Sequence, residues 1–147
     1  MDEYTIQSII DICHEKKIQE VHFECHWIHK NEVPAFRRLF AAEGITLKLK
    51  IGIETFDQHM RQNVLCKGMA ESDPKIISSY FDEACFLFGL TGQTKESMQN
   101  DIETGLKYFE RICLNIMVEN STDIKPDSDV IDIFARELYP LYKDDPR

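Results

Sequence analysis

The sequence lacks three features that would point to common classes of protein: closely spaced cysteine pairs, a long apolar run and a basic cluster. None of the five cysteines belongs to a CxxC pair, and no apolar run has the length that crosses a membrane. The 26 acidic residues outnumber the 17 basic ones, which form no run that would neutralise a nucleic-acid backbone. We therefore expect neither a nucleic acid nor a membrane as a partner.

The cysteines also indicate the compartment. Cys25, Cys85 and Cys113 lie in apolar segments, where a free cysteine behaves as a small core residue. The sequence does not open with the pattern of a signal peptide. We therefore expect a cytoplasmic protein with reduced thiols and no disulfides.

Segments with helical periodicity alternate along the chain with short segments rich in strand-forming residues. The predicted helices cover 4–17 and 32–43 and begin near 74, 94 and 127, while the predicted strands cover 21–27, 46–54, 83–90 and 111–118. A short helix and a loop are expected in 55–70. This alternation predicts right-handed β–α–β crossovers and a parallel sheet.

We interpret residues 1–147 as a single α/β domain of parallel β–α units that form about half of a TIM-like barrel. The chain begins with a helix that would ordinarily follow a strand, and it stops after a helix. We therefore expect a fragment of a longer protein.

Two of the predicted strands alternate apolar with polar residues, whereas strands buried on both faces are apolar throughout. The polar positions of these two strands are His22, Glu24, His26, Lys48, Lys50 and Glu54, and Glu119 follows the fourth strand. This face is either the wet side of an open sheet or the lining of a cavity in which the groups pair with each other and with a ligand. We favour the cavity, with the C-terminal strand ends nearest the ligand.

The first strand does not predict a metal site. His22, Glu24 and His26 span roughly 13 Å at a rise of about 3.3 Å per residue, so one ion cannot reach all three. No Ser/His/Asp arrangement is present. The turn 89–94 (GLTGQT) leads from a strand to a helix N-terminus and offers free backbone N–H groups to a ligand, although an ordinary βα loop needs the same residues.

Taken in order, the segments at the strand ends resemble the radical S-adenosylmethionine (radical SAM) superfamily. The segment 51–57 (IGIETFD), followed by Arg61 and by Lys67 and Gly68, is similar to the family's Gly-Ile-Glu-Ser strand end with a basic residue and glycine about a dozen residues later. The segment 88–97 (FGLTGQTKES) is similar to the next strand's Gly-Leu-Pro-Gly-Glu-Thr loop. The resemblance covers about 21–119.

The resemblance implies a partial barrel with S-adenosylmethionine (SAM) lying across the C-terminal strand ends. Glu54 and Thr55 would face the ribose of SAM or the substrate, the loop with Gly89 and Gly92 would shape the adenine pocket, and Asn115 would reach the sugar or the methionine part. His22, Glu24, His26, Lys48, Lys50 and Glu119 would line the inner face towards the substrate.

One departure from the family pattern is decisive for the chemistry. The family holds a [4Fe–4S] cluster on a CxxxCxxC loop, and this sequence has no such loop. The resemblance therefore implies SAM and a cluster in a parent protein that cleaves SAM reductively, while this chain alone is expected to hold no cofactor and to be inactive.

Two other functions remain open at this point. One is a non-catalytic module that binds a nucleotide-like ligand near Glu54 and Gly92. The other is a phosphate-binding barrel lyase or isomerase that uses Lys48 or Lys50 as an amine nucleophile. Because an open half-barrel leaves sheet edges unpaired, we also expect a homodimer that covers the open sheet.

Overall fold

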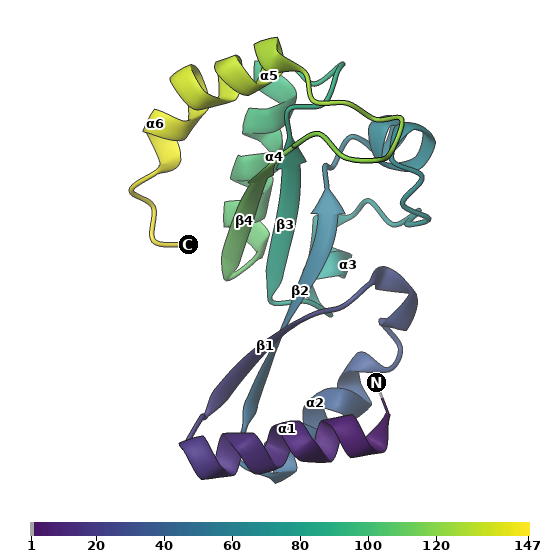
Figure 1. Cartoon of the computed structure of the whole chain (residues 1–147), viewed down its shortest axis with the longest axis vertical. Coiled ribbons are helices and arrows are strands. Elements are labelled where there is room, and N and C mark those ends of the chain that lie inside the picture. Colours follow the sequence, from purple (N-terminus) through teal and green to yellow (C-terminus); the bar gives the residue numbers. More distant parts are fainter. Residues whose placement is uncertain (1) are drawn as a thin grey trace.

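The computed structural model describes residues 2–147 and contains one parallel sheet of four strands in the order β1-β2-β3-β4. The strands are β1 (Glu20–Glu24), β2 (Thr46–Glu54), β3 (Glu83–Phe88) and β4 (Arg111–Ile116). Each strand pairs in parallel with the next one along the chain. The prediction of an α/β fold of parallel β–α units that form a partial barrel is therefore confirmed (Figure 1).

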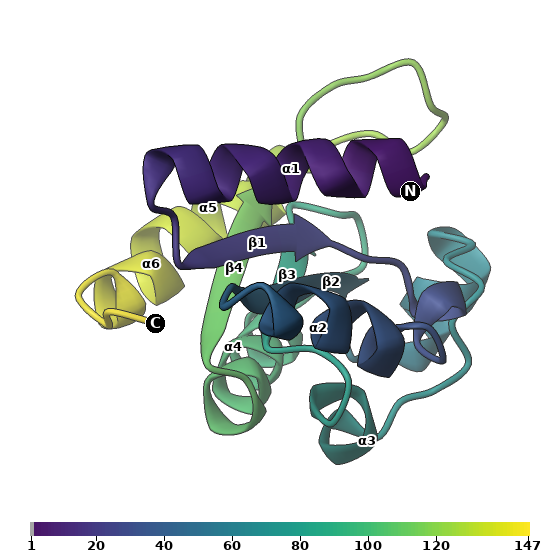
Figure 2. The ribbon, with the colours of Figure 1, turned by 90° about the horizontal axis from the view of Figure 1, so that it is seen from below.

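Helices alternate with the strands along the sequence, as predicted, with α1 (Glu3–Lys16) before the first strand and three short helical segments after the last one. They are α1 (Glu3–Lys16), η1 (Trp27–His29), α2 (Val33–Ala42), η2 (Met60–Val64), α3 (Pro74–Ser78), α4 (Lys95–Tyr108), α5 (Ser128–Ile133), η3 (Phe134–Leu138) and α6 (Tyr139–Tyr142). Helix α4 lies behind β3 and β4, whereas α1 and α2 flank β1 (Figures 1 and 2). No helix within 2–147 combines the length and the apolar character that a membrane crossing requires.

Short polar side chains begin most of the longer helices. Asp2 accepts a hydrogen bond from the backbone N–H of Thr5 at the start of α1, and Thr94 forms a reciprocal capping box with Ser97 at the start of α4. Asp73 caps α3 ahead of a proline in its first turn, as the sequence predicted. The local sequence therefore fixes the starts of α1, α3 and α4, whereas α2 begins without a side-chain cap.

The core lies on the apolar side of the alternating strands. In β2 the side chains of Leu47, Leu49, Ile51 and Ile53 are buried, whereas the intervening polar positions are only half-buried. These apolar residues belong to one continuous cluster with α2 and α4, in which Phe40, Phe86 and Ile102 are fully buried. The polar residues consequently share the opposite, inner face of the sheet.

Three predicted strands extend beyond the observed ones, at their C-terminal ends. β1 ends at Glu24 because His26 accepts a hydrogen bond from the N–H of Ile28 and begins the helical turn η1. β3 ends at Phe88 because Gly89 takes a left-handed backbone conformation with φ of 96°. β4 ends at Ile116, two residues before the predicted end. These early ends turn the chain into the loops that carry the candidate site.

Candidate functional site

A cavity of about 300 Å³ opens at the C-terminal ends of the strands. It is lined by Glu24, Cys25, His26, Gly52, Glu54, Lys67, Cys85 and Asn115. Four of these residues were predicted from the sequence as site residues: Glu24, His26, Glu54 and Asn115. They come from three strands and their following loops, so the parallel sheet brings together side chains that are up to 91 positions apart, from Glu24 to Asn115.

The strongest polar contact in this cavity joins Glu54 and Lys67. The Lys67 Nζ lies 2.6 Å from the Glu54 Oε1, and both side chains are half-buried. Glu54 has a φ of 68°, an uncommon left-handed conformation for a residue with a side chain. Gly52 leaves room for the pair, because a Cβ there would lie 2.9 Å from the Glu54 Oε1 and 3.1 Å from the Lys67 Nζ.

His26 connects the first strand end to the loop that carries Lys67. Its Nδ1 accepts from the N–H of Ile28 at 3.3 Å, and its Nε2 lies 3.3 Å from the backbone carbonyl of Lys67. These two contacts assign the proton to Nε2, because an imidazole nitrogen that accepts an N–H carries no proton of its own. The ring therefore bridges two loops at the rim of the cavity.

Two thiols lie deeper on the inner face. Cys85 is buried in β3 and pairs in register with Cys113 of β4. Burial, and then the neighbouring Cys113, raise the pKa of the Cys85 thiol to about 12. The Cys113 thiol donates to the Asn115 Oδ1 at 3.6 Å. Cys85 is consequently a protonated, neutral part of the cavity wall, and its role as lining was not predicted from the sequence.

The loop after β3 contains the predicted Gly89 and Gly92, which both have left-handed backbones with φ of 96° and 95°. The buried side chain of Gln93 closes this loop: its Oε1 accepts from the N–H of Leu90 at 2.9 Å, and its Nε2 donates to the carbonyl of Leu87 at 2.8 Å. Gly89 also packs against α5, since a Cβ on it would lie 2.6 Å from the Ile131 Cγ1. Neither glycine lines the cavity itself.

Thr55 is only 1% exposed and faces the protein interior. Its hydroxyl accepts from the N–H of Asp57 at 3.0 Å, and its backbone carbonyl accepts from Arg61 at 3.2 Å. Thr55 therefore does not line the cavity. Its contacts with Asp57 and Arg61 instead hold the backbone at the end of β2.

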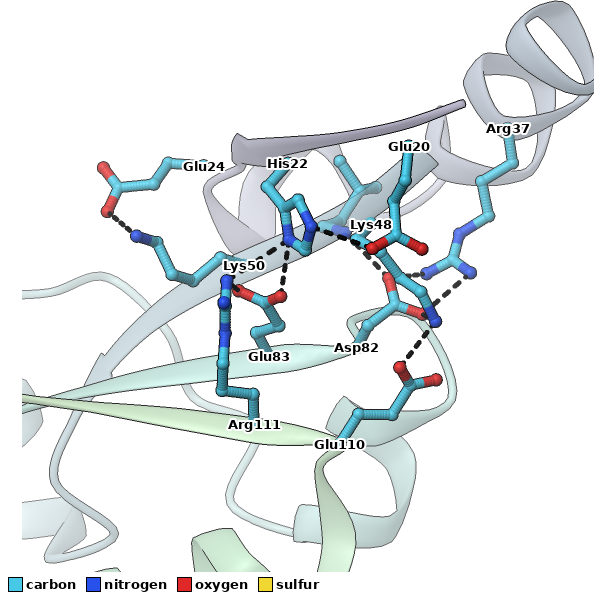
Figure 3. A network of polar contacts seen from close by, with 11 residues as sticks. Glu20, His22, Glu24, Arg37, Lys48, Lys50, Asp82, Glu83, Glu110 and Arg111 are labelled. Atoms are coloured by element: carbon cyan, nitrogen blue, oxygen red, sulfur yellow. Dashed lines mark hydrogen bonds and ion pairs between the residues drawn. The ribbon is translucent and has the colours of Figure 1, made fainter. Parts of the chain in front are cut away.

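His22 belongs to a second group of polar residues, at the N-terminal ends of the strands (Figure 3). Its Nδ1 lies 2.6 Å from the Glu83 Oε1 and its Nε2 lies 3.1 Å from the Glu20 Oε1. The other Glu83 oxygen accepts from Arg111 at 2.8 Å. Burial raises the pKa of Glu83, but the bonds from Arg111 and His22 outweigh it and hold this pKa below its ordinary value.

The two predicted lysines of β2 are also engaged in ion pairs. Lys48 lies 2.5 Å from Glu110 and 4.0 Å from Asp82, and Lys50 lies 3.3 Å from Glu24 (Figure 3). The hydrogen bond to Glu110 is the main cause that raises the pKa of Lys48. The pKa of Lys50 is raised by Cys85, through a thiolate that forms only at high pH, and by the contact with Glu24. An amine that forms imines needs the opposite, a lowered pKa, so these contacts do not favour the lyase or isomerase function.

Glu119 does not line the cavity. It lies on the loop after β4, its side chain is 80% exposed, and its nearest cationic partner is Lys125 at 3.9 Å. Of the eleven residues predicted for the site, Glu24, His26, Glu54 and Asn115 therefore line the cavity, Lys50 contacts it through Glu24, and the remainder lie beside or below it.

The residues of the cavity suit an organic ligand better than a metal. Within the described part of the chain, no group of three or more His, Cys, Asp or Glu side chains is arranged to hold a metal ion. The cavity is instead lined by polar groups of four kinds next to Gly52: the carboxylates of Glu24 and Glu54, the ammonium of Lys67, the amide of Asn115 and the imidazole of His26. Such convergent polar groups at the C-terminal ends of parallel strands are typical of sites for nucleotide-like molecules.

Comparisons with known proteins give one informative match. No protein-family model matches the chain, and no curated protein matches it either. Among solved structures, the chain is similar to a queuine lyase from Clostridium spiroforme bound to SAM and queuine, with 38% identity and a TM-score of 0.88. The match covers 97% of this chain and 60% of that chain. The resemblance to the radical SAM superfamily, which the motifs at the strand ends predicted, is thereby confirmed over nearly the whole length of this chain.

Proposed function

We propose that this chain supplies SAM and substrate contacts in a radical SAM enzyme that cleaves SAM reductively and acts on a queuine-like base. The observation that carries the proposal is the cavity at the strand ends, in which Glu54, Lys67 and Asn115 converge. The similarity to a queuine lyase with SAM and queuine bound supports it.

The polar groups of the cavity match those of SAM. The Glu54 carboxylate accepts hydrogen bonds and suits the two ribose hydroxyls, while the Lys67 ammonium suits the carboxylate of the methionine part. The Asn115 amide both donates and accepts, and it suits the sugar or the amino-acid end. Gly89 and Gly92 give the adjoining loop the left-handed backbone with which it shapes the adenine side.

The substrate would lie on the first-strand side of the cavity. Glu24 is largely exposed there and pairs with Lys50 at 3.3 Å, and His26 lies beside it. Queuine is a 7-deazaguanine base that carries a secondary ammonium, and a carboxylate such as that of Glu24 would neutralise this cation. We propose that Glu24, His26 and Lys50 contact the substrate.

The residues of this chain do not fit an iron–sulfur cluster. The cysteines are tens of residues apart, except that β3 and β4 bring Cys85 and Cys113 together, and two thiolates are fewer than the three that the family's loop provides. We therefore expect the cluster to be held by residues outside this sequence and the isolated chain to make no radical. An iron and sulfide assay that finds stoichiometric amounts in the purified 147-residue chain would contradict this expectation.

SAM binding tests the proposal directly. In the chain together with any flanking reading frame, reconstituted with iron and sulfide, we expect titration calorimetry to detect SAM binding. We expect Lys67→Met to weaken that binding about tenfold or more, because the variant loses a charge-assisted bond to the ligand. Lys143→Met is the matched control, because Lys143 follows α6 far from the cavity and its loss changes net charge equally. Equal affinity of wild type and Lys67→Met would refute the assigned role.

A non-catalytic binding module is the second candidate, and the missing cluster motif favours it. The two functions differ in their products. If the chain together with any flanking reading frame is reconstituted with iron and sulfide and then reduced, a radical SAM enzyme releases 5′-deoxyadenosine. A module binds SAM and releases none.

We also propose that the chain self-associates and works among the reduced thiols of the cytoplasm. β1 and β4 each have one edge without a strand partner within the described residues, and all five cysteines are free. Light scattering tests the first proposal. A monomer at high concentration would contradict a homodimer through the open sheet.

A further inference from the structure

Two buried charged side chains hold the peptide group between Thr55 and Phe56, just beyond Glu54. The N–H of Phe56 donates to the Asp101 Oδ1 at 2.7 Å, and the carbonyl of Thr55 accepts from the Arg61 Nη1 at 3.2 Å. This N–H and this carbonyl belong to the same peptide unit. A carboxylate from α4 and a guanidinium from η2 therefore fix both ends of a single peptide plane at the end of β2.

Both side chains are almost completely buried, with exposures of 1% for Asp101 and 0% for Arg61. Each keeps one polar atom, the Asp101 Oδ2 and the Arg61 Nε, that has no hydrogen-bond partner among the described residues. Buried charges with incomplete hydrogen bonding reduce stability relative to apolar residues of the same shape. Stability of the core alone therefore does not account for this pair.

Arg61 also connects the strand end to the loop that carries Lys67. Its Nη2 donates to the carbonyl of Glu71 at 2.6 Å, and its own backbone carbonyl accepts from the N–H of Lys67 at 3.0 Å. The two members of the cavity's ion pair, Glu54 and Lys67, are thus positioned from the same buried residue.

We infer that Asp101 and Arg61 are positioning residues that keep Glu54 in its left-handed conformation and thereby aim its carboxylate, with Lys67, at the ligand of the cavity. The functional half of this inference rests on the proposed SAM site. A left-handed φ of 68° is unfavourable for glutamate, so it persists only where the surroundings impose it. The clamped peptide lies one residue beyond Glu54 and supplies that constraint.

The electrostatics around Asp101 agree with this role. Burial raises its pKa to about 6, and the bond from the Phe56 N–H and the nearby Thr55 hydroxyl work in the opposite direction. Asp57 raises this pKa further, whereas Arg61 lowers it. Near neutral pH the carboxylate is therefore ionised, which strengthens its bond to the Phe56 N–H.

The first test needs no ligand. NMR coupling constants report φ of Glu54, and we expect a positive φ in wild type and in Asp101→Asn, which keeps an oxygen for the Phe56 N–H. We expect a negative φ in Asp101→Ala. The control is Ile77→Ala, which opens the core on α3 and should leave φ unchanged. If Asp101→Ala does not fold, Arg61→Lys replaces it, because a single ammonium cannot reach both carbonyls. A positive φ in the clamp variant overturns the inference.

The second test measures the SAM affinity of the reconstituted protein, the chain with any flanking reading frame, in a double-mutant cycle of Asp101→Ala and Glu54→Gln. We expect each single variant to lose about tenfold in affinity, and the double variant to lose little more than either single one, because both act through the same carboxylate. Additive losses would overturn the positioning role. If wild type binds no SAM, the proposed function fails, and the NMR result still decides whether the clamp exists.

Discussion

Asp101 predicts a pH dependence of stability that a single substitution removes. Its ordinary pKa is 3.8, and burial raises it to about 6 in the folded protein. Between these two values the folded chain binds a proton that the unfolded chain has lost, so this group makes the free energy of unfolding fall as the pH rises. At about 1.4 kcal/mol per pKa unit, the gap amounts to about 3 kcal/mol, which is lost between roughly pH 4 and pH 6 and stays lost at higher pH.

Urea denaturation of wild type and Asp101→Asn across pH 4 to 8 isolates this contribution. Asparagine keeps the acceptor for the Phe56 N–H but does not titrate, so the stability of the variant relative to wild type should improve by about 2 kcal/mol from pH 4 to pH 7. All other titrating groups cancel in this difference. Ile77→Val, which removes one buried methyl group, should give a difference that is flat with pH. A flat difference for Asp101→Asn as well would refute the reasoning.

Three further outcomes are expected. Glu83→Gln should lower the free energy of unfolding, measured in urea, by about 3 kcal/mol, because it leaves Arg111 and His22 without their buried partner. Glu110→Gln should lower it by less than about 1 kcal/mol, because Glu110 forms an exposed pair with Lys48. Equal losses in the two variants would contradict this prediction. Gly89→Ala should lower the free energy of unfolding by at least about 2 kcal/mol, because the new methyl group would clash with Ile131. Gly44 is also left-handed but has no atom within 4 Å of its added Cβ, so Gly44→Ala should lower the free energy of unfolding by about 1 kcal/mol. A Gly89 variant as stable as the Gly44 variant would exclude the clash. In the folded chain, a thiol reagent should modify the exposed Cys66 first and Cys85 last, because Cys85 is buried and its pKa is raised to about 12. Mass spectrometry of the modified peptides measures this order, and any other order would contradict the prediction.

The fold could be predicted from the sequence because its signals are local and repeated. Apolar and polar residues alternate in β2 at the period of a strand, and Thr94 and Asp73 begin helices at predicted positions. The ends of strands were less predictable. Val21–Trp27 has the composition of one strand, but the side chain of His26 bonds to the N–H of Ile28 and starts a turn there, a competition that composition does not reveal.

The site could be predicted only in part. The alternation of polar and apolar residues shows which face of the sheet a side chain lies on, but it does not show how far along that face the side chain lies from the cavity. His22 and Glu24 are two residues apart on the same face of β1, yet His22 pairs with Glu83 at the base and Glu24 lines the cavity. The register of four strands decides this, and a single strand carries no information on it. The hydrogen bond from the Phe56 N–H to Asp101 could not be predicted either, because Asp101 lies on α4, which the sequence shows only as an amphipathic helix.

The polar inner face of the sheet has two ends with different capacities for a ligand. At the base, Glu83 is bound by His22 and Arg111, and its carboxylate is only 5% exposed. Each of its two oxygens is therefore already bonded within the protein, and almost none of its surface is open to a ligand. At the top, Glu54 and Lys67 share one short contact and stay half-buried, although a carboxylate can accept about four hydrogen bonds and an ammonium donates three. The unused capacity faces the cavity, where burial under a ligand would leave it unsatisfied unless the ligand has hydroxyl and carboxylate groups of its own. The end of the sheet at Glu54 and Lys67 still has hydrogen-bonding capacity for a ligand, whereas the end at Glu83 does not. We therefore expect a ligand with hydroxyl and carboxylate groups at the end that carries Glu54 and Lys67.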